Sequence, residues 1–125
     1  MPDPRNDGHI CYIEIPAPDV AKAKRFYAAV FGWRTEDSDL GDAAYTMFRA
    51  GAMIGGLDSS KQPTDKGVLL YLKVEDIPSA LRAIREAGGE VITNKSQVTD
   101  GSDAYGFAAT FTDPNGNLLG LWAKS

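Results

Sequence analysis

The chain contains one residue pattern twice, with the second copy displaced by 57 positions. In each copy an aspartate precedes a run that has apolar residues at helical spacing, and a glycine follows that run. Asp19 aligns with Asp76, and Gly32 aligns with Gly89. These residues are typical of the N-cap and the C-terminal stop of a helix. The repeat therefore predicts two modules of the same layout, each with one helix.

Each predicted helix has one strand-like segment before it and three after it, rich in β-branched and aromatic residues. The expected strands are residues 10–15, 33–36, 44–49 and 52–57, then 68–74, 90–94, 105–112 and 118–123. Residues 58–67, DSSKQPTDKG, have loop composition and separate the halves. The order predicts an α+β fold of tandem βαβββ modules. Module one covers about 8–57 and module two about 68–123 of a single domain, 1–125.

The length and the single cysteine limit the class of protein. A chain of 125 residues can bury one core without disulfides. Cys11 is the only cysteine, so no disulfide can form within the chain, which favours a reducing compartment and predicts a cytoplasmic protein. Because Cys11 lies in an apolar run, we expect a small buried residue rather than a reactive thiol.

Charge and hydropathy argue against two kinds of partner. The net charge of −4 arises from scattered residues, and no basic cluster suited to phosphates occurs, so we expect no nucleic acid partner. The first eight residues, MPDPRNDG, are polar, and no apolar run approaches the length of a membrane span. We therefore expect no membrane partner.

Several motifs together resemble the vicinal oxygen chelate superfamily, which includes glyoxalase I, bleomycin-resistance proteins, fosfomycin-resistance enzymes and extradiol dioxygenases. They are EIPAPDVAKAKRFYAAVFGW (14–33), the pair Gly55-Gly56, YLKVEDI (71–77) and FTDPNGN (111–117). The resemblance extends from about Ile10 to Trp122. It implies two βαβββ modules whose sheets form a curled mixed sheet around a cup. In the enzymes, His, Gln and Glu side chains hold a divalent metal at the floor of this cup.

The resemblance places the usual metal ligands at Tyr12, Leu69 and Gly120, the last being three residues after Asn117. None of these side chains suits the divalent metals of the superfamily, so we expect no metal and no cofactor. His9 is the only histidine, and without a histidine partner it is expected at the surface or at a strand end.

A site of three carboxylates from Glu14, Glu75 and Asp113 stays an alternative. Asp113 is already explained by its DPNGN turn and Glu75 by its place beside a helix cap.

Strand alternation separates the side chains of the first strand into two faces. Tyr12 and Glu14 share one face, and Cys11, Ile13 and Ile15 share the face that we expect against the helices. If Tyr12 and Glu14 turn toward the cup, Glu14 is a candidate catalytic general base or an acceptor for a ligand. The alternative is a cross-strand ion pair of Glu14 with Lys73 or Arg49.

The predicted ligand-binding residues are mostly aromatic: Tyr12, Glu14, Leu69, Tyr71, Gly120 and Trp122, with Tyr45, Met53 and Phe107 from strands of uncertain register. Gly120 stands inside an apolar strand, where the missing side chain is expected to open space beside Tyr12 and Trp122. The alternatives are that a neighbouring backbone or the Trp122 ring packs against Gly120, and that the aromatic residues fill the cup as core.

These sequence features are compatible with three functions. The first is a metal-free homodimer that binds a small, partly apolar or aromatic organic molecule in the cup. The second is an enzyme of the superfamily, a lyase, isomerase or dioxygenase, with a non-standard metal site or with Glu14 as general base. The third is a structural or partner-docking domain whose cup is filled.

Overall fold

The computed structural model of the chain describes residues 10–38, 44–64, 66–99 and 101–125. Module one contains β1 (Ile13–Pro16), α1 (Val20–Phe31), β2 (Arg34–Asp37), β3 (Tyr45–Ala50) and β4 (Met53–Asp58). Module two contains β5 (Tyr71–Lys73), α2 (Ile77–Glu86), β6 (Glu90–Thr99), β7 (Ser102–Thr112) and β8 (Leu118–Ala123). Within the described ranges, neither helix has the length and apolar character needed to cross a membrane.

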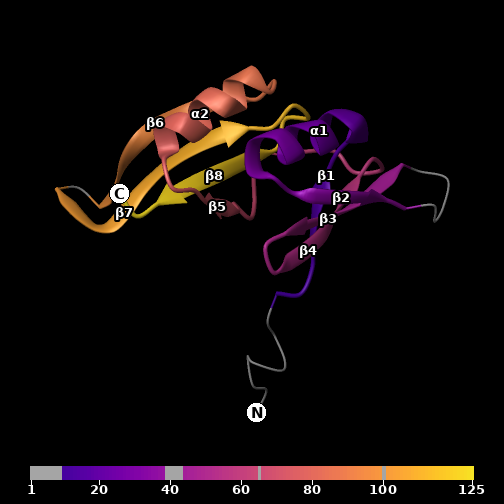
Figure 1. Cartoon of the computed structure of the whole chain (residues 1–125), viewed down its shortest axis with the longest axis horizontal. Helices are drawn as coiled ribbons and strands as arrows, with labels where there is room; N and C mark the ends of the chain where they lie inside the picture. The colour runs from indigo at the N-terminus through magenta and orange to yellow at the C-terminus, as the bar shows by residue number, and fades with distance from the viewer. Residues whose placement is uncertain (1–9, 39–43, 65, 100) are drawn as a thin grey trace, which may run out of the picture.

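The strands form two mixed four-stranded sheets with the same topology, β1-β4-β3-β2 and β5-β8-β7-β6. In each sheet the first strand pairs in parallel with the last, and the other pairs are antiparallel. The predicted α+β fold of tandem βαβββ modules is therefore confirmed. In the described part of the chain no strand of one sheet pairs with a strand of the other. The two sheets form an arch, and both helices lie on its outer side (Figure 1).

The predicted helix caps are formed by side-chain contacts. The amide of Lys22 donates to Asp19 Oδ1 at 3.1 Å, and the amide of Ser79 donates to Asp76 Oδ2 at 3.0 Å. Hydrogen bonding from Ser79 also holds the pKa of the Asp76 carboxyl below its ordinary value. Gly32 ends α1 in the left-handed conformation, with φ of 71°. The two aspartates thus begin the helices at the positions that the repeat predicts.

The first strand differs from its prediction, and so does the environment of Cys11. Pairing of β1 begins at Ile13, opposite Gly55, so residues 10–12 precede the ladder. Cys11 is exposed, and the prediction of a buried residue is wrong. Alternation holds beyond that point, because Ile15 is buried in the core while Glu14 stays exposed.

The lengths of three strands in module two were also predicted wrongly. β5 covers Tyr71–Lys73 rather than 68–74, whereas β6 and β7 extend past their predicted ends. The last residue of β8 lies opposite Phe107, but β7 continues its pairing with β6 as far as Ser102 opposite Thr99. The two longer strands therefore project beyond the sheet as a two-stranded extension.

One hydrophobic core joins the two modules. Tyr27 of α1 stacks on Trp33, with ring centroids 4.3 Å apart. Phe111 of module two packs against Phe26 and Phe31 of module one, at centroid distances of 6.1 and 5.9 Å. Tyr27, Phe26 and Phe111 are almost fully buried. This shared core fixes the helices over the junction of the two sheets.

The DPNGN turn adds a polar contact between the modules. Asp113 is buried at 3% exposure and accepts four hydrogen bonds. The donors are the Tyr27 hydroxyl at 2.7 Å, the amides of Asn115 and Asn117, and Asn117 Nδ2. Burial, and secondarily the Asp113 carboxylate, raises the pKa of the Tyr27 hydroxyl, so it stays a donor.

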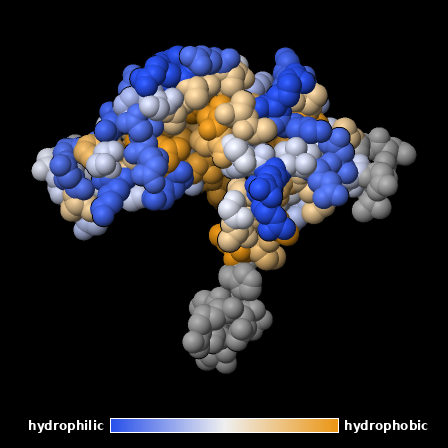
Figure 2. All heavy atoms as spheres, in the orientation of Figure 1, coloured by the Kyte–Doolittle hydropathy of each residue, from blue (hydrophilic) through white to orange (hydrophobic). Residues whose placement is uncertain are grey.

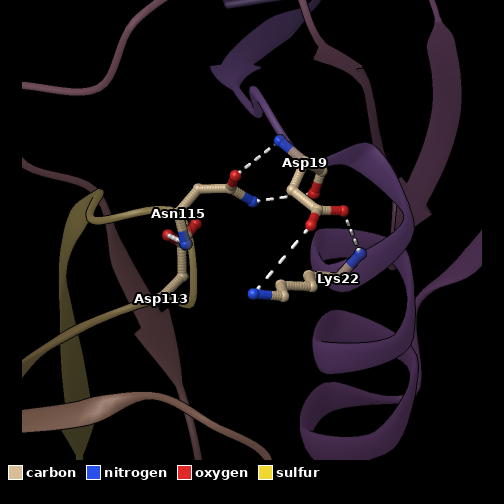
Figure 3. Close-up of polar contacts among 4 residues, drawn as sticks. All are labelled: Asp19, Lys22, Asp113 and Asn115. Atoms are coloured by element: carbon tan, nitrogen blue, oxygen red, sulfur yellow. Dashed lines mark hydrogen bonds and ion pairs between the residues drawn. The ribbon is translucent and has the colours of Figure 1, made fainter.

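The two asparagines of this turn bind the backbone of module one. Asn117 Nδ2 donates to the Pro16 carbonyl oxygen at 2.6 Å. Asn115 exchanges two hydrogen bonds with the backbone of Asp19, of 2.7 and 3.0 Å, next to the contact of Asp19 with Lys22 (Figure 3). The turn is therefore the joint between the modules as well as a hairpin connection.

Candidate functional site

A chain of polar side chains lies on module one. The hydroxyls of Tyr12 and Tyr45 are 2.6 Å apart, and the Tyr45 hydroxyl donates to Glu14 Oε2 at 3.1 Å. The other carboxylate oxygen of Glu14 lies 3.7 Å from the ammonium group of Lys61. Glu14 is therefore paired with Lys61, and the predicted alternative of Lys73 or Arg49 as its partner is wrong. We call Tyr12, Tyr45 and Glu14 the tyrosine chain.

Gly56 makes room for the tyrosine chain. It lies directly opposite Glu14 in the β1–β4 ladder, and a Cβ added there would overlap the end of the Tyr45 ring. The absent side chain lets Tyr45 lie across β4 and reach Glu14. Burial, followed by the hydrogen bonds with Tyr12 and Glu14, raises the pKa of the Tyr45 hydroxyl. Tyr45 therefore keeps its proton and remains the donor to Glu14.

An aromatic surface occupies the equivalent part of module two. Tyr71 lies opposite Gly120 in the β5–β8 ladder, as Glu14 lies opposite Gly56. Trp122 is held in one orientation, because its Nε1 donates to the Tyr105 carbonyl oxygen at 2.9 Å. Gly106 has φ of 78°, and a Cβ there would approach the Trp122 ring to 2.8 Å. The indole therefore rests on the backbone of β7.

Gly120 is buried under the ring of Tyr71. A Cβ at Gly120 would lie 2.5 Å from two atoms of that ring. The expectation of open space beside Gly120 is therefore wrong, and the alternative that named the backbone or Trp122 identified the wrong neighbour. The glycine instead lets Tyr71 lie flat on β8.

Gly120→Ala is expected to lower the free energy of unfolding by about 1 kcal/mol, the lower end of the range for overpacking. The cost is small because Tyr71 is 53% exposed and its ring can turn toward solvent. Urea denaturation measures the change. In a Tyr71→Ala background the same substitution should cost almost nothing, and an equal loss in both backgrounds would show that another neighbour resists the added methyl group.

Three hollows adjoin residues 66–73, and we call the three together the cup, although the central hollow lies on the Ile13 and Phe48 face of module one. The β1 hollow, of 360 Å³, lies between β1, residues 64 and 66–70, and residues 117–119. The central hollow, of 490 Å³, includes Phe48, Met53 and Tyr71. The β8 hollow, of 460 Å³, is lined by Tyr71, Val98, Ala108 and Trp122. Figure 2 shows the molecule hollowed between its two halves, with hydrophobic residues gathered at the roof.

Five of the predicted site residues line these hollows: Tyr12, Glu14, Met53, Tyr71 and Trp122. The structure brings Tyr12, Glu14 and Tyr45 together in one group and Tyr71, Gly120 and Trp122 in another. Met53 lies opposite Ala50, on the face of Phe48 rather than that of Tyr45. Among the contacts that the structure describes, no hydrogen bond joins the group of Tyr12 to the group of Tyr71.

Four predicted residues line none of the three hollows: Tyr45, Gly120, Phe107 and Leu69. Phe107 lies opposite Ala123, packs against the core, and has the Lys95 ammonium 4.6 Å from its ring centroid. Alternation therefore puts it on the face opposite Trp122. Leu69 is half-buried, and its neighbour Leu70 lines the β1 and central hollows in its place.

Sequence reasoning missed Lys61 and the spacer role of Gly56. Lys61 lies in the loop between the modules, where no periodicity indicates which side chain turns toward Glu14. Gly56 belongs to a glycine pair that is visible in the sequence. The pair alone does not reveal which side chain needs its space.

The donor set at the positions implied for a metal does not fit a divalent cation. The Tyr12 hydroxyl is engaged with Tyr45, Leu69 has no donor, and Gly120 is covered by Tyr71. Asp113 is committed to the joint between the modules. Among the described residues no group of three or more His, Cys, Asp and Glu side chains is placed to hold a metal, and His9 lies outside those residues.

Comparisons with known proteins define the family. A model of the glyoxalase-like domain matches residues 12–121, and the chain therefore belongs to the glyoxalase-like domain family. In structure it is similar to a glyoxalase/bleomycin resistance protein/dioxygenase family enzyme from Burkholderia phytofirmans PsJN. The TM-score is 0.75 at 16% identity, over 94% of this chain and 100% of that one. The superfamily predicted from the motifs is thus confirmed.

Two relatives were found by sequence. The anthracycline biosynthesis protein DnrV of Streptomyces peucetius is 29% identical over 94% of this chain and 47% of its own length. A glyoxylase-like domain-containing protein of Didymella fabae is 27% identical over 94% of both chains. The chain thus spans about half the length of the first of these relatives and nearly all of the second.

Proposed function

We propose that the protein binds a small, partly apolar or aromatic organic molecule in the cup between the modules, without a metal. The observation that carries the proposal is the β8 hollow, the part of the cup whose lining residues belong to module two. There Tyr71 is 53% exposed beside a tryptophan that is held in place, around 460 Å³ of open space. Exposed aromatic surface around a hollow of this size is typical of sites for small organic ligands.

The fixed indole supports binding by stacking. The Nε1 of Trp122 is already committed to the Tyr105 carbonyl oxygen, so the ring offers a ligand its face rather than a hydrogen bond. A ring that is immobilised before binding loses little entropy when a ligand packs on it. One relative is named for anthracycline biosynthesis. For this chain we propose only that the ligand is a small organic molecule.

The alternative is a superfamily enzyme with Glu14 as catalytic base or with a non-standard metal site. Both oxygens of Glu14 have partners, the Tyr45 hydroxyl and the Lys61 ammonium, and the side chain of Asp58 is a further hydrogen-bonding neighbour. These contacts favour a carboxylate that orients neighbouring groups over one that removes a proton from a substrate. We therefore propose that the protein binds its ligand without converting it.

A homodimer is part of the proposal. The edge strands are β1 and β2 in one sheet and β5 and β6 in the other, and an open strand edge favours pairing with another chain. Met47, on β3 beside β2, and Ile92, on β6, also expose apolar surface. Light scattering of a monomer mass at tens of micromolar would contradict the dimer. The cytoplasmic location remains a prediction from the single cysteine.

Tyr71→Ala is expected to weaken binding of 2-naphthol about 3- to 10-fold, because the substitution removes one face of the aromatic wall. Isothermal titration of chelator-treated protein, with elemental analysis to verify that it is metal-free, measures the effect. Tyr105→Ala is the matched control, since Tyr105 is 65% exposed and does not line the β8 hollow. Absence of binding at millimolar probe, or equal weakening by both variants, would contradict the proposal.

A further inference from the structure

The tyrosine chain has a single hydrogen-bond direction. A tyrosine hydroxyl carries one proton, and that of Tyr45 is donated to Glu14. The 2.6 Å contact between the two hydroxyls then requires Tyr12 to be the donor. The proton of Tyr12 points toward Tyr45, which leaves only lone pairs on the Tyr12 oxygen for any other partner.

The hydrogen bonds of the tyrosine chain also make the Tyr12 oxygen a stronger hydrogen-bond acceptor. Each hydrogen bond that a hydroxyl donates polarises its oxygen, so successive bonds reinforce one another, and this chain ends on a carboxylate. Within the described part of the chain, Tyr45 is the sole hydrogen-bond partner of the Tyr12 hydroxyl. Tyr12 is 38% exposed and lines the β1 hollow.

The walls of the β1 hollow are mainly apolar. Among its lining residues are Ile10, Ile13, Val68, Leu70 and Leu118. These side chains suit an apolar body of a ligand, and the hollow of 360 Å³ has room for a bicyclic ring. Thr64, Lys66 and Asn117 also line the hollow, so the tyrosine chain is one of several polar groups that a ligand packed on these apolar side chains can reach.

We propose that the Tyr12 hydroxyl oxygen accepts a hydrogen bond from the ligand and so selects ligands that carry a donor. The ligand class is a neutral molecule with an apolar or aromatic body and one O–H or N–H group, such as an aryl alcohol or an arylamine. A ligand that offers only an acceptor leaves the Tyr12 oxygen facing another lone pair, and therefore binds more weakly. This inference rests on the proposed function and places the selective contact in the β1 hollow, a different part of the cup from the β8 hollow of Tyr71 and Trp122.

Tyr45 is a positioning residue in this scheme. It fixes the direction of the Tyr12 proton without itself lining the β1 hollow. Loss of its hydroxyl frees the Tyr12 proton, and Tyr12 then serves a donor or an acceptor equally well. The ratio of the affinities for a donor ligand and an acceptor ligand, rather than either affinity alone, therefore tests the role of Tyr45.

The test compares two probes of nearly equal shape, 2-naphthol, which can donate, and 2-methoxynaphthalene, which cannot. Isothermal titration of chelator-treated wild-type protein should give a 3- to 10-fold preference for 2-naphthol, the range expected for one hydrogen bond. Tyr12→Phe should remove the preference, so that the two probes bind with about equal affinity. Tyr45→Phe should reduce it as well, while 2-methoxynaphthalene binds as tightly as before or more tightly.

Other outcomes distinguish the inference from the function on which it rests. Equal binding of both probes to the wild type, or a preference that persists in Tyr12→Phe, overturns the inference and leaves the binding function intact. Tighter binding of 2-naphthoate than of 2-naphthol also overturns it, because Lys61 or Lys66 would then select an anion. Binding of none of these probes overturns the proposed function together with the inference.

Discussion

Asp113→Ala is expected to lower the free energy of unfolding by about 3 kcal/mol or more, through loss of the joint between the modules. The substitution removes the acceptor of four hydrogen bonds at a buried site. Each donor left without a partner costs about 1–3 kcal/mol, and the losses are not additive because the groups adjoin one another. Urea denaturation followed by circular dichroism measures the change.

Asp103→Ala is the control for this experiment, because the Asp103 carboxylate is exposed and accepts one hydrogen bond, from Gln97. It should cost less than about 0.5 kcal/mol. Tyr27→Phe combined with Asp113→Ala should cost less than the sum of the single changes, since both remove the same contact. A loss below about 1 kcal/mol for Asp113→Ala would show that the aromatic core alone holds the modules together.

Gly55→Ala and Gly56→Ala are adjacent substitutions that we expect to destabilise the protein to different extents. A Cβ at Gly55 would overlap the carbonyl oxygen of Ile13 and the ring of Phe48, so β1 and β4 would have to separate. We expect a loss of about 3 kcal/mol or more, since backbone cannot yield as a side chain does. A Cβ at Gly56 meets only the end of the Tyr45 ring, which can move toward solvent, at a cost of about 1 kcal/mol.

Thermal melts of the two variants, with near-ultraviolet circular dichroism for the tyrosines, measure this difference. Gly56→Ala should fold and lose the naphthol preference, as Tyr45→Phe does, whereas Gly55→Ala should melt far lower or fail to fold. Equal melting temperatures for the two variants would contradict the contacts on which the tyrosine chain depends.

Local patterns in the sequence predicted the elements of this fold. Asp19 and Asp76 cap their helices through contacts three residues away, and the 57-residue repeat carried the topology of one module to the next. Such features depend on neighbours in the sequence, so periodicity and capping residues were enough. Cys11 was misplaced because the start of β1 is set by its partner β4, which no local pattern fixes.

The candidate site was predicted less completely, because it depends on contacts between distant residues. Glu14 and Tyr12 were placed on one face by alternation, but their link through Tyr45 spans more than thirty residues and needs the register of β3. Gly120 was recognised as unusual, yet its neighbour Tyr71 lies in a strand 49 residues earlier. The bonds of Asp113 and Asn117 to module one were missed for the same reason.

The most direct test of the central claim is to map where an aromatic molecule contacts the protein. Chelator-treated, isotope-labelled protein is titrated with 2-naphthol, and the chemical-shift changes are followed by nuclear magnetic resonance. We expect saturable changes at Tyr12, at Tyr71 and at the indole N–H of Trp122, with the outer surfaces of α1 and α2 unaffected. Changes confined to those outer surfaces, or none at millimolar probe, would contradict binding in the cup.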